Sequence, residues 1–157
     1  MANKVFKIVD WSGASFNGND LTTSVATIYP GLLVVKDAGA DTVSLCGASG
    51  SIPFGFAHGN RDMVYKPTTN TFATGEPLNV VSGHGYALVS ADYFASGSIP
   101  PDAAGYDIIY AAASGKMDWA GTNKLARFIS QKAVTDPSGG TGTSNTVALI
   151  EFNFPVL

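Results

Sequence analysis

The two histidines are the first side chains to consider for acid–base or metal chemistry. His58 and His84 are each followed by glycine in a segment whose composition predicts a loop. A metal site would need both imidazoles to converge with a carboxylate such as Asp62 or Asp92, and nothing in their spacing brings them together. We therefore expect no metal site. We interpret both histidines as solvent-exposed turn residues, with a pH-sensitive contact between subunits as the alternative.

Other catalytic patterns are missing from the sequence. Gly115-Lys116 precedes Met117, where a phosphate-binding loop needs Ser or Thr, and no serine has the glycine spacing of a nucleophile elbow. Two pairs of acids lie in turn-forming segments, where Asp usually bonds its own backbone: Asp37 with Asp41, and Asp102 with Asp107. The sequence predicts that the protein is not an enzyme and holds no cofactor. A hydrolase that uses Asp and His in loops is the weaker hypothesis.

Composition limits the partners of the protein. The chain has 157 residues, a formal net charge of −3, and 13% charged against 45% hydrophobic residues, which suits a single compact domain. The acidic balance argues against nucleic acid and against a polybasic membrane contact. The longest uncharged stretch, residues 42–60, holds too many glycines for a membrane helix.

The cysteine and the N-terminus indicate where the protein is made. Cys46 is the single cysteine, so it can form no intramolecular disulfide, and we expect it to be a small buried hydrophobe. The first residues show no apolar core of signal-peptide length. Both features are typical of a protein that folds in a reducing cytosol.

Short apolar runs between turn residues predict an all-β fold, a small sandwich or barrel with short strands, long loops and little helix. Residues 1–20 are predicted to form an N-terminal arm or a first strand with a hairpin at Asn17-Gly18, and residues 21–157 a single β-domain. A hairpin is expected at Gly83-His84-Gly85, and residues 124–134 fit either a strand or a helix. The expected strands are 5–9, 24–29, 32–36, 42–46, 54–57, 76–82, 86–94, 108–111, 116–119, 124–134 and 146–154.

Two segments have the same pattern. Residues 31–57 and residues 105–133 each run from a glycine through an apolar strand, a glycine-containing turn, an alternating strand and a loop to a third strand. A strand pair followed by a third strand is the simplest unit that buries one face of a sheet. The alternatives are an internal repeat and a coincidence between ordinary hairpins.

These segments carry a resemblance to a known family. The relevant runs are Pro30-Gly31-Leu32-Leu33-Val34-Val35, Phe54-Gly55-Phe56-Ala57, Gly105-Tyr106-Asp107-Ile108-Ile109-Tyr110, Ser114-Gly115-Lys116, Ala126-Arg127-Phe128-Ile129-Ser130 and Val147-Ala148-Leu149-Ile150-Glu151-Phe152. Over about residues 30–154 the chain resembles the capsid decoration, or cement, proteins of tailed bacteriophages. The resemblance implies a β-tulip-like domain that binds the outer surface of the assembled capsid. Its partners would be the major capsid protein and itself, as a homotrimer, and it would stabilise the virion against the pressure of packaged DNA.

Two surfaces are candidates for these contacts. The N-terminal segment could contact the capsid or pair with a neighbouring subunit through Val5, Phe6, Ile8 and Trp11, although it could equally be an ordinary first strand. For the trimer interface we consider the apolar closing strand and the region around residues 103–113. The residues expected there are Ile108, Tyr110, Ile150 and Phe152.

A carbohydrate- or receptor-binding module, such as a head fibre or a tail accessory domain, is the alternative function. Aromatic side chains near loops and strand ends could stack on sugar rings. The candidates are Trp11, Tyr65, Tyr93, Tyr106 and Trp119. Selectivity for sugars on a glycan array would distinguish this class from a decoration protein.

Overall fold

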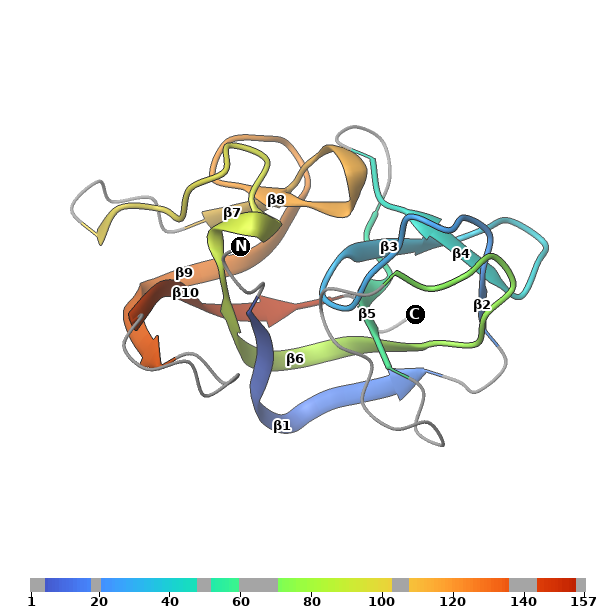
Figure 1. The fold of residues 1–157 in the computed structure, drawn as a ribbon, viewed down its shortest axis with the longest axis horizontal. Coiled ribbons are helices and arrows are strands. Elements are labelled where there is room, and N and C mark those ends of the chain that lie inside the picture. Colours follow the sequence, from blue (N-terminus) through green and yellow to red (C-terminus); the bar gives the residue numbers. More distant parts are fainter. Residues whose placement is uncertain are drawn as a thin grey trace.

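The structure, a computed structural model, describes residues 5–17, 21–47, 52–59, 71–102, 108–135 and 144–154. Within these ranges the chain forms ten β-strands and short 3-10 turns, so the all-β prediction is confirmed (Figure 1). The strands are β1 (Phe6–Asn17), β2 (Thr22–Thr23), β3 (Leu33–Lys36), β4 (Thr42–Leu45), β5 (Gly55–His58), β6 (Asn79–Val89), β7 (Ile108–Ala111), β8 (Met117–Asp118), β9 (Lys124–Thr135) and β10 (Ser144–Asn153).

Strand β6 is the centre of the sheet. Along one edge, β6 pairs with β1. Two strands share its other edge: Val81 of β6 pairs with Phe56 of β5, and Tyr86 of β6 pairs with Glu151 of β10. The strand order is β2-β4-β3-β5-β6-β10-β9-β7-β8, and all pairs except β2 with β4 are antiparallel. Two arms of the sheet therefore diverge from β6, one through β5 and one through β10 (Figure 1).

The two arms share one connectivity. In each, a hairpin (β3–β4 or β7–β8) is followed by a strand that pairs with the free edge of its first strand (β5 with β3, β9 with β7). The next strand then pairs antiparallel with that third strand, β6 with β5 and β10 with β9. The sequence similarity between residues 31–57 and 105–133 thus corresponds to a repeated strand topology.

The main core lies between the two arms. Three phenylalanines meet there: the ring of Phe56 lies 5.4 Å from that of Phe152 and 4.9 Å from that of Phe154, both nearly edge-on. All three are at most 1% exposed, and burial of each such side chain contributes about 1.5–3 kcal/mol. The arms also touch at their ends, where the N–H of Gly115 donates to the carbonyl of Cys46 at 2.8 Å. A smaller core lies around β2, β3 and β4 and includes Ile28 and Phe72.

Gly83-His84-Gly85 is not a hairpin, as the sequence predicted, but the middle of β6. A Cβ on Gly85 would lie 2.6 Å from the ring of Phe152 and 2.7 Å from the carbonyl oxygen of Asp10. Gly83 adopts a φ of 80°, and β1 opposite has two register shifts, between Ile8 and Gly13. The glycines therefore allow neighbouring strands to pack closely against an irregular part of β6, and they do not form a turn.

Two further expectations change, and the strand expected over residues 124–134 is confirmed. Residues 24–29 form no strand, because the chain pairs only at Thr22–Thr23 before it turns. Residues 124–134 form a strand and no helix, since β10 and β7 occupy both of its edges. The strands are also not uniformly short, because β1, β6, β9 and β10 have 12, 11, 12 and 10 residues.

Candidate functional site

The outward face of β6, β10, β9 and β7 carries a row of side chains with different chemistry. Tyr86, Glu151, Arg127 and Ile108 lie directly opposite one another in register, one from each strand. Directly opposed residues share a face of the sheet and interact across the strands. The row therefore places an aromatic ring, an acid, a base and an exposed aliphatic side chain side by side at the surface.

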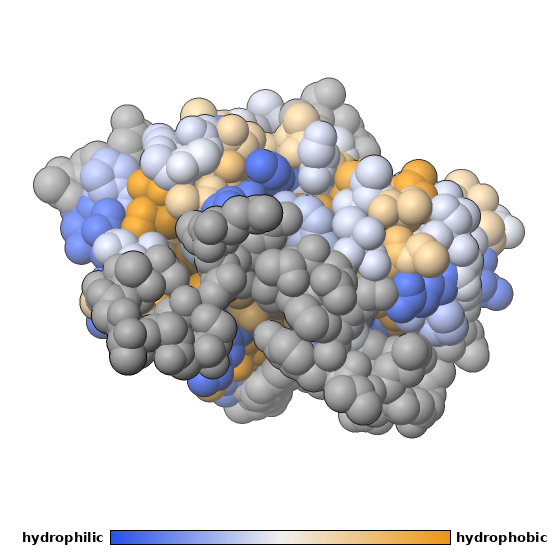
Figure 2. Space-filling model, viewed as in Figure 1, coloured by the Kyte–Doolittle hydropathy of each residue, from blue (hydrophilic) through white to orange (hydrophobic). Residues whose placement is uncertain are grey.

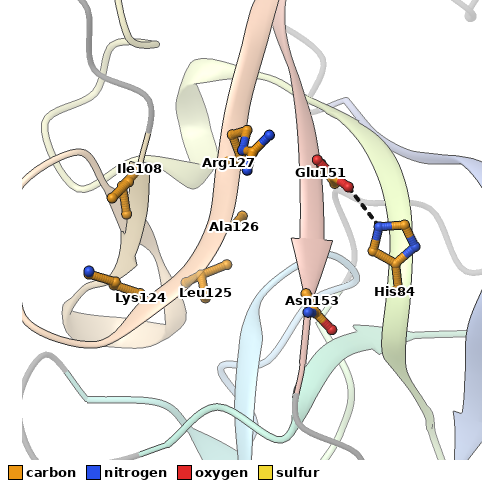
Figure 3. A pocket seen from close by; sticks show the side chains of 8 residues that line it. All are labelled: His84, Ile108, Lys124, Leu125, Ala126, Arg127, Glu151 and Asn153. Carbon is orange, nitrogen blue, oxygen red and sulfur yellow. Dashed lines mark hydrogen bonds and ion pairs between the residues drawn. The ribbon is translucent and has the colours of Figure 1, made fainter.

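An open groove of about 400 Å³ runs along this row (Figure 3). Cationic side chains from β9 and the apolar side chain of Ile108 lie on one side, and the pair formed by His84 and Glu151 lies on the other (Figure 3). The groove is lined by His84, Ile108, Lys124, Leu125, Ala126, Arg127, Glu151 and Asn153.

A bulge in β9 brings the cationic side chains of Lys124 and Arg127 to this groove. Ala126 pairs with Ile109 and Lys124 with Tyr110, so Leu125 is one extra residue on β9. In a regular strand, residues 124 and 127 would point to opposite faces because side chains alternate. The bulge redirects the strand, and Lys124 and Arg127 line the same groove.

His84 and Glu151 form the polar wall of the groove. The Nε2 of His84 lies 2.8 Å from Oε1 of Glu151, and both side chains are partly exposed. The hydrogen bond with His84 holds the pKa of Glu151 below its usual value, with further lowering from Arg127 and Tyr86. Glu151 is therefore ionised at neutral pH. The eight described lining residues combine charged and polar side chains with apolar ones.

The N-terminal residues lie mostly inside the protein. Val5 and Ile8 are 9% and 6% exposed, and the ring of Phe6 lies 4.9 Å from that of Phe56. Val5 and Ile8 therefore pack in the chain's own core and present no surface to a capsid, whereas Phe6 is only partly buried against that core. Trp11 lies in β1, and its side chain is outside the described part of the structure. The alternative of an ordinary first strand fits the pairing of β1 along β6.

Half of the predicted trimer interface is also internal. Ile150 and Phe152 are completely buried, because they occupy the inward-facing positions of β10. Ile108 is 36% exposed at the groove and Tyr110 is partly buried, so only these two reach the surface. Residues 103–107 of the predicted region lie outside the described residues.

The predicted aromatic platform does not assemble in the described part of the chain. Tyr93 is fully buried, and its hydroxyl donates to the carbonyl of Pro30 at 2.7 Å. Trp119 is half-buried, with its ring 6.0 Å from that of Phe94. Tyr65 and Tyr106 lie outside the described residues.

Both histidines lie in strands, not in the turns that the sequence predicted. His58 ends β5, and burial lowers its pKa, whereas His84 lies in the middle of β6. Asp62 is outside the described residues, and Asp92 accepts a hydrogen bond from Ser90 at 3.1 Å. Within the described ranges no three His, Cys, Asp or Glu side chains are grouped as metal ligands.

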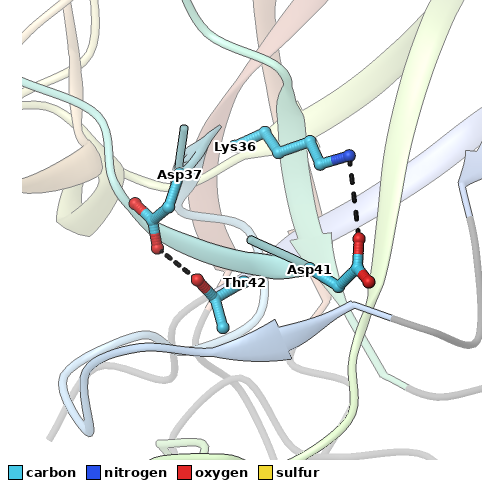
Figure 4. A network of polar contacts seen from close by, with 4 residues as sticks. All are labelled: Lys36, Asp37, Asp41 and Thr42. Atoms are coloured by element: carbon cyan, nitrogen blue, oxygen red, sulfur yellow. Dashed lines mark hydrogen bonds and ion pairs between the residues drawn. The ribbon is translucent and has the colours of Figure 1, made fainter. Parts of the chain in front are cut away.

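The acids of the β3–β4 hairpin have a structural role (Figure 4). Thr42 and Ser44 each donate a hydrogen bond of 2.7 Å to the carboxylate of Asp37. Both hydrogen bonds lower the pKa of Asp37, and the bond from Ser44 has the larger effect. Lys36 and Asp41 form an exposed ion pair at 3.9 Å, a geometry that contributes little to stability. The carboxylate of Asp37 therefore joins the turn to β4 through side-chain hydroxyls, and not through its own backbone as the sequence predicted.

One face of the molecule shows how its hydrophobic residues are distributed (Figure 2). On the side of the molecule visible in Figure 2, hydrophobic residues occur in separate patches among hydrophilic ones. The part of the chain that the structure describes contains no helix long and apolar enough to cross a membrane. Searches against protein-family profiles, curated proteins and solved structures find no match to this chain.

The groove is the feature that sequence reasoning missed. The alternation in residues 146–154 already separates Leu149, Glu151 and Asn153 from the inward-facing residues. The sequence holds no signal for which residue of β6 or β9 stands opposite Glu151, because strand register depends on pairing between distant segments.

Proposed function

We propose that the protein is a non-enzymatic structural protein of a tailed-bacteriophage virion. In this proposal it binds the major capsid protein on the outer surface of the assembled capsid, as a homotrimer, and stabilises the shell against internal DNA pressure. The observation that carries the proposal is the outward sheet face from β1 to β7, which exposes aliphatic side chains between charged ones.

The composition of this face suits a protein contact. Val9, Ile129 and Ile108 are 45%, 43% and 36% exposed, well above the exposure of a core side chain. Lys7 and Arg127 are exposed beside them. Interfaces of moderate strength combine apolar contacts with a polar surround, and binding at several lattice sites raises the effective affinity of an oligomer.

The described residues of the runs that carry the resemblance can be located on the strands. The glycine-led runs of the resemblance correspond to β3 with β5 and to β7 with β9, and the final run lies in β10. The residues that resemble decoration proteins thus form the two repeated units and the strand that links them.

A binding assay on capsids tests the proposal. Shells assembled from the major capsid protein encoded in the same genome are incubated with the protein and sedimented. We expect the wild-type protein to cosediment, and we expect Ile129→Asp on β9 to weaken binding about tenfold, equivalent to about 1.4 kcal/mol.

Val25→Asp is the matched control, because Val25 is 36% exposed next to β2, at the opposite end of the strand order. It should bind within about twofold of wild type, below about 0.5 kcal/mol. Failure of the wild-type protein to bind these shells would contradict the proposed function. Equal losses for both variants would contradict the assignment of the face.

A further inference from the structure

We propose that the groove between β6, β10, β9 and β7 receives an acidic segment of the capsid partner, whose carboxylate is held by Arg127 and Lys124. This inference rests on the proposed function and names the chemistry of the contact. The partner residue is an Asp or Glu in a segment that also presents an aliphatic side chain.

Lys124 and Arg127 form no hydrogen bond or close ion pair with the part of the chain that the structure describes. Arg127 acts on Glu151 only through the longer-range attraction that contributes to its low pKa. Both side chains are exposed, so their donors are available to a ligand.

The acid among the described lining residues is already engaged. Glu151 takes part in a 2.8 Å contact with Nε2 of His84. Apart from His84, the described lining residues carry two positive charges and one negative charge. A protein with a net charge of −3 therefore has a local positive excess at this groove, which favours an anion.

The shape of the donors and the apolar wall favour a peptide carboxylate. The planar guanidinium of Arg127 can bind a carboxylate with two parallel hydrogen bonds, and the ammonium of Lys124 adds a point charge beside it. Ile108, Leu125 and Ala126 supply an apolar wall along the same groove. A segment with an acidic and an aliphatic side chain would satisfy both parts of this surface.

The β-bulge in β9 is the local feature that creates this arrangement. If residues 124–127 formed a regular strand with no bulge at Leu125, alternation would place Lys124 on the face opposite to Arg127. The convergence of the two cations is thus a property of the strand's geometry and not of sequence spacing alone.

The test measures affinity for capsid shells at low salt with charge variants of the groove. We expect Arg127→Ala and Lys124→Ala each to weaken binding about tenfold and the double variant about a hundredfold. Lys36→Ala is the matched control, because Lys36 is an exposed cation on β3 in the other arm of the sheet. Its affinity should stay within about twofold of wild type. Thermal unfolding of each variant checks that the fold is intact.

Raising the salt concentration provides a second measurement. Wild-type binding should weaken with salt, and the double variant should lose most of this dependence, because the charges that salt screens are gone. Wild-type affinity and wild-type salt dependence in the double variant would overturn the inference while leaving the proposed function intact. Wild-type protein that binds no shells would overturn both. Arg127-dependent binding to an acidic glycan, with shell binding unaffected by either substitution, would show that the groove takes a sugar acid and would overturn the inference.

Discussion

Gly85 lies directly opposite Phe152 in the β6–β10 pair, and the missing side chain of Gly85 leaves the space that the ring occupies. A Cβ at this position would lie 2.6 Å from Cζ of Phe152 and 2.7 Å from the carbonyl oxygen of Asp10. The glycine thus allows β1, β6 and β10 to pack closely around one ring of the main core. This relationship explains why a glycine-rich tripeptide lies within a long strand.

Replacing Gly85 with Ala should destabilise the protein. The added methyl group overlaps the Phe152 ring on one side and the β1 backbone on the other, and such overpacking costs about 1–3 kcal/mol. Urea denaturation at neutral pH measures the change in the free energy of unfolding. In a Phe152→Leu background the same substitution should cost less, because the crowded ring is gone. An unchanged free energy of unfolding in Gly85→Ala would contradict the close packing described here.

Replacing Tyr93 with Phe should remove one buried hydrogen bond. The Tyr93 hydroxyl donates to the carbonyl of Pro30 at 2.7 Å, and its loss should cost about 1–2 kcal/mol of stability. Chemical denaturation gives the difference. Tyr110→Phe is the control, since the Tyr110 hydroxyl makes no hydrogen bond with the described residues. Equal changes in the free energy of unfolding for the two substitutions would contradict a stabilising role for the Tyr93–Pro30 hydrogen bond.

Cys46 should react slowly with thiol reagents in the native protein. Its side chain is completely buried, and burial raises its pKa to about 11 from the ordinary 9.0. At pH 8 this shift alone lowers the thiolate fraction about a hundredfold, and the thiolate is the reactive form. The rate of labelling by an aromatic disulfide reagent, followed by absorbance, should rise sharply when urea unfolds the chain. Fast labelling without denaturant would contradict this prediction.

The ionised form of Glu151 should stabilise the fold above about pH 4.5, its ordinary pKa. The pKa of Glu151 is lowered in the folded protein, chiefly by the hydrogen bond with His84. The ionised carboxylate therefore stabilises the fold fully above its ordinary pKa. This stabilisation is lost as the pH falls through the folded pKa. We therefore expect Glu151→Gln to be less stable than wild type at pH 7, with the gap narrowing at about pH 3.

Urea denaturation at both pH values measures this gap. Asp41→Asn serves as the control, because its ion pair with Lys36 is exposed and long at 3.9 Å. It should change stability by less than about 0.5 kcal/mol at either pH. A constant gap between Glu151→Gln and wild type across this range would show that the ionised carboxylate does not contribute as described.

Much of the fold could be predicted from local pattern. The runs that became β3, β4, β5, β7 and β10 have the alternation or the apolar continuity that a strand needs, and the turns beside them hold glycine. The repeat of one strand unit was visible as well, because both copies need the same order of strands and turns to bury a face.

The prediction failed where the secondary structure or the burial of a residue depended on pairing with a distant strand. Gly83 and Gly85 have the composition of a turn, yet β1 and β10 hold them in a strand by pairing along both edges. Ile150 and Phe152 were expected at a subunit interface, yet the sheet turns them into the main core. The sequence near these residues does not specify which distant strands pair with them.

The all-β fold could be read from the order of residues along the chain, because side-chain alternation and turn composition depend on near neighbours. Pairing between distant strands brings His84, Arg127 and Glu151 to one groove, and a bulge at Leu125 adds Lys124 to it. The physical reason is strand register. A shift of one residue reverses every side chain of a strand, and register is set by hydrogen bonds between segments far apart in the chain.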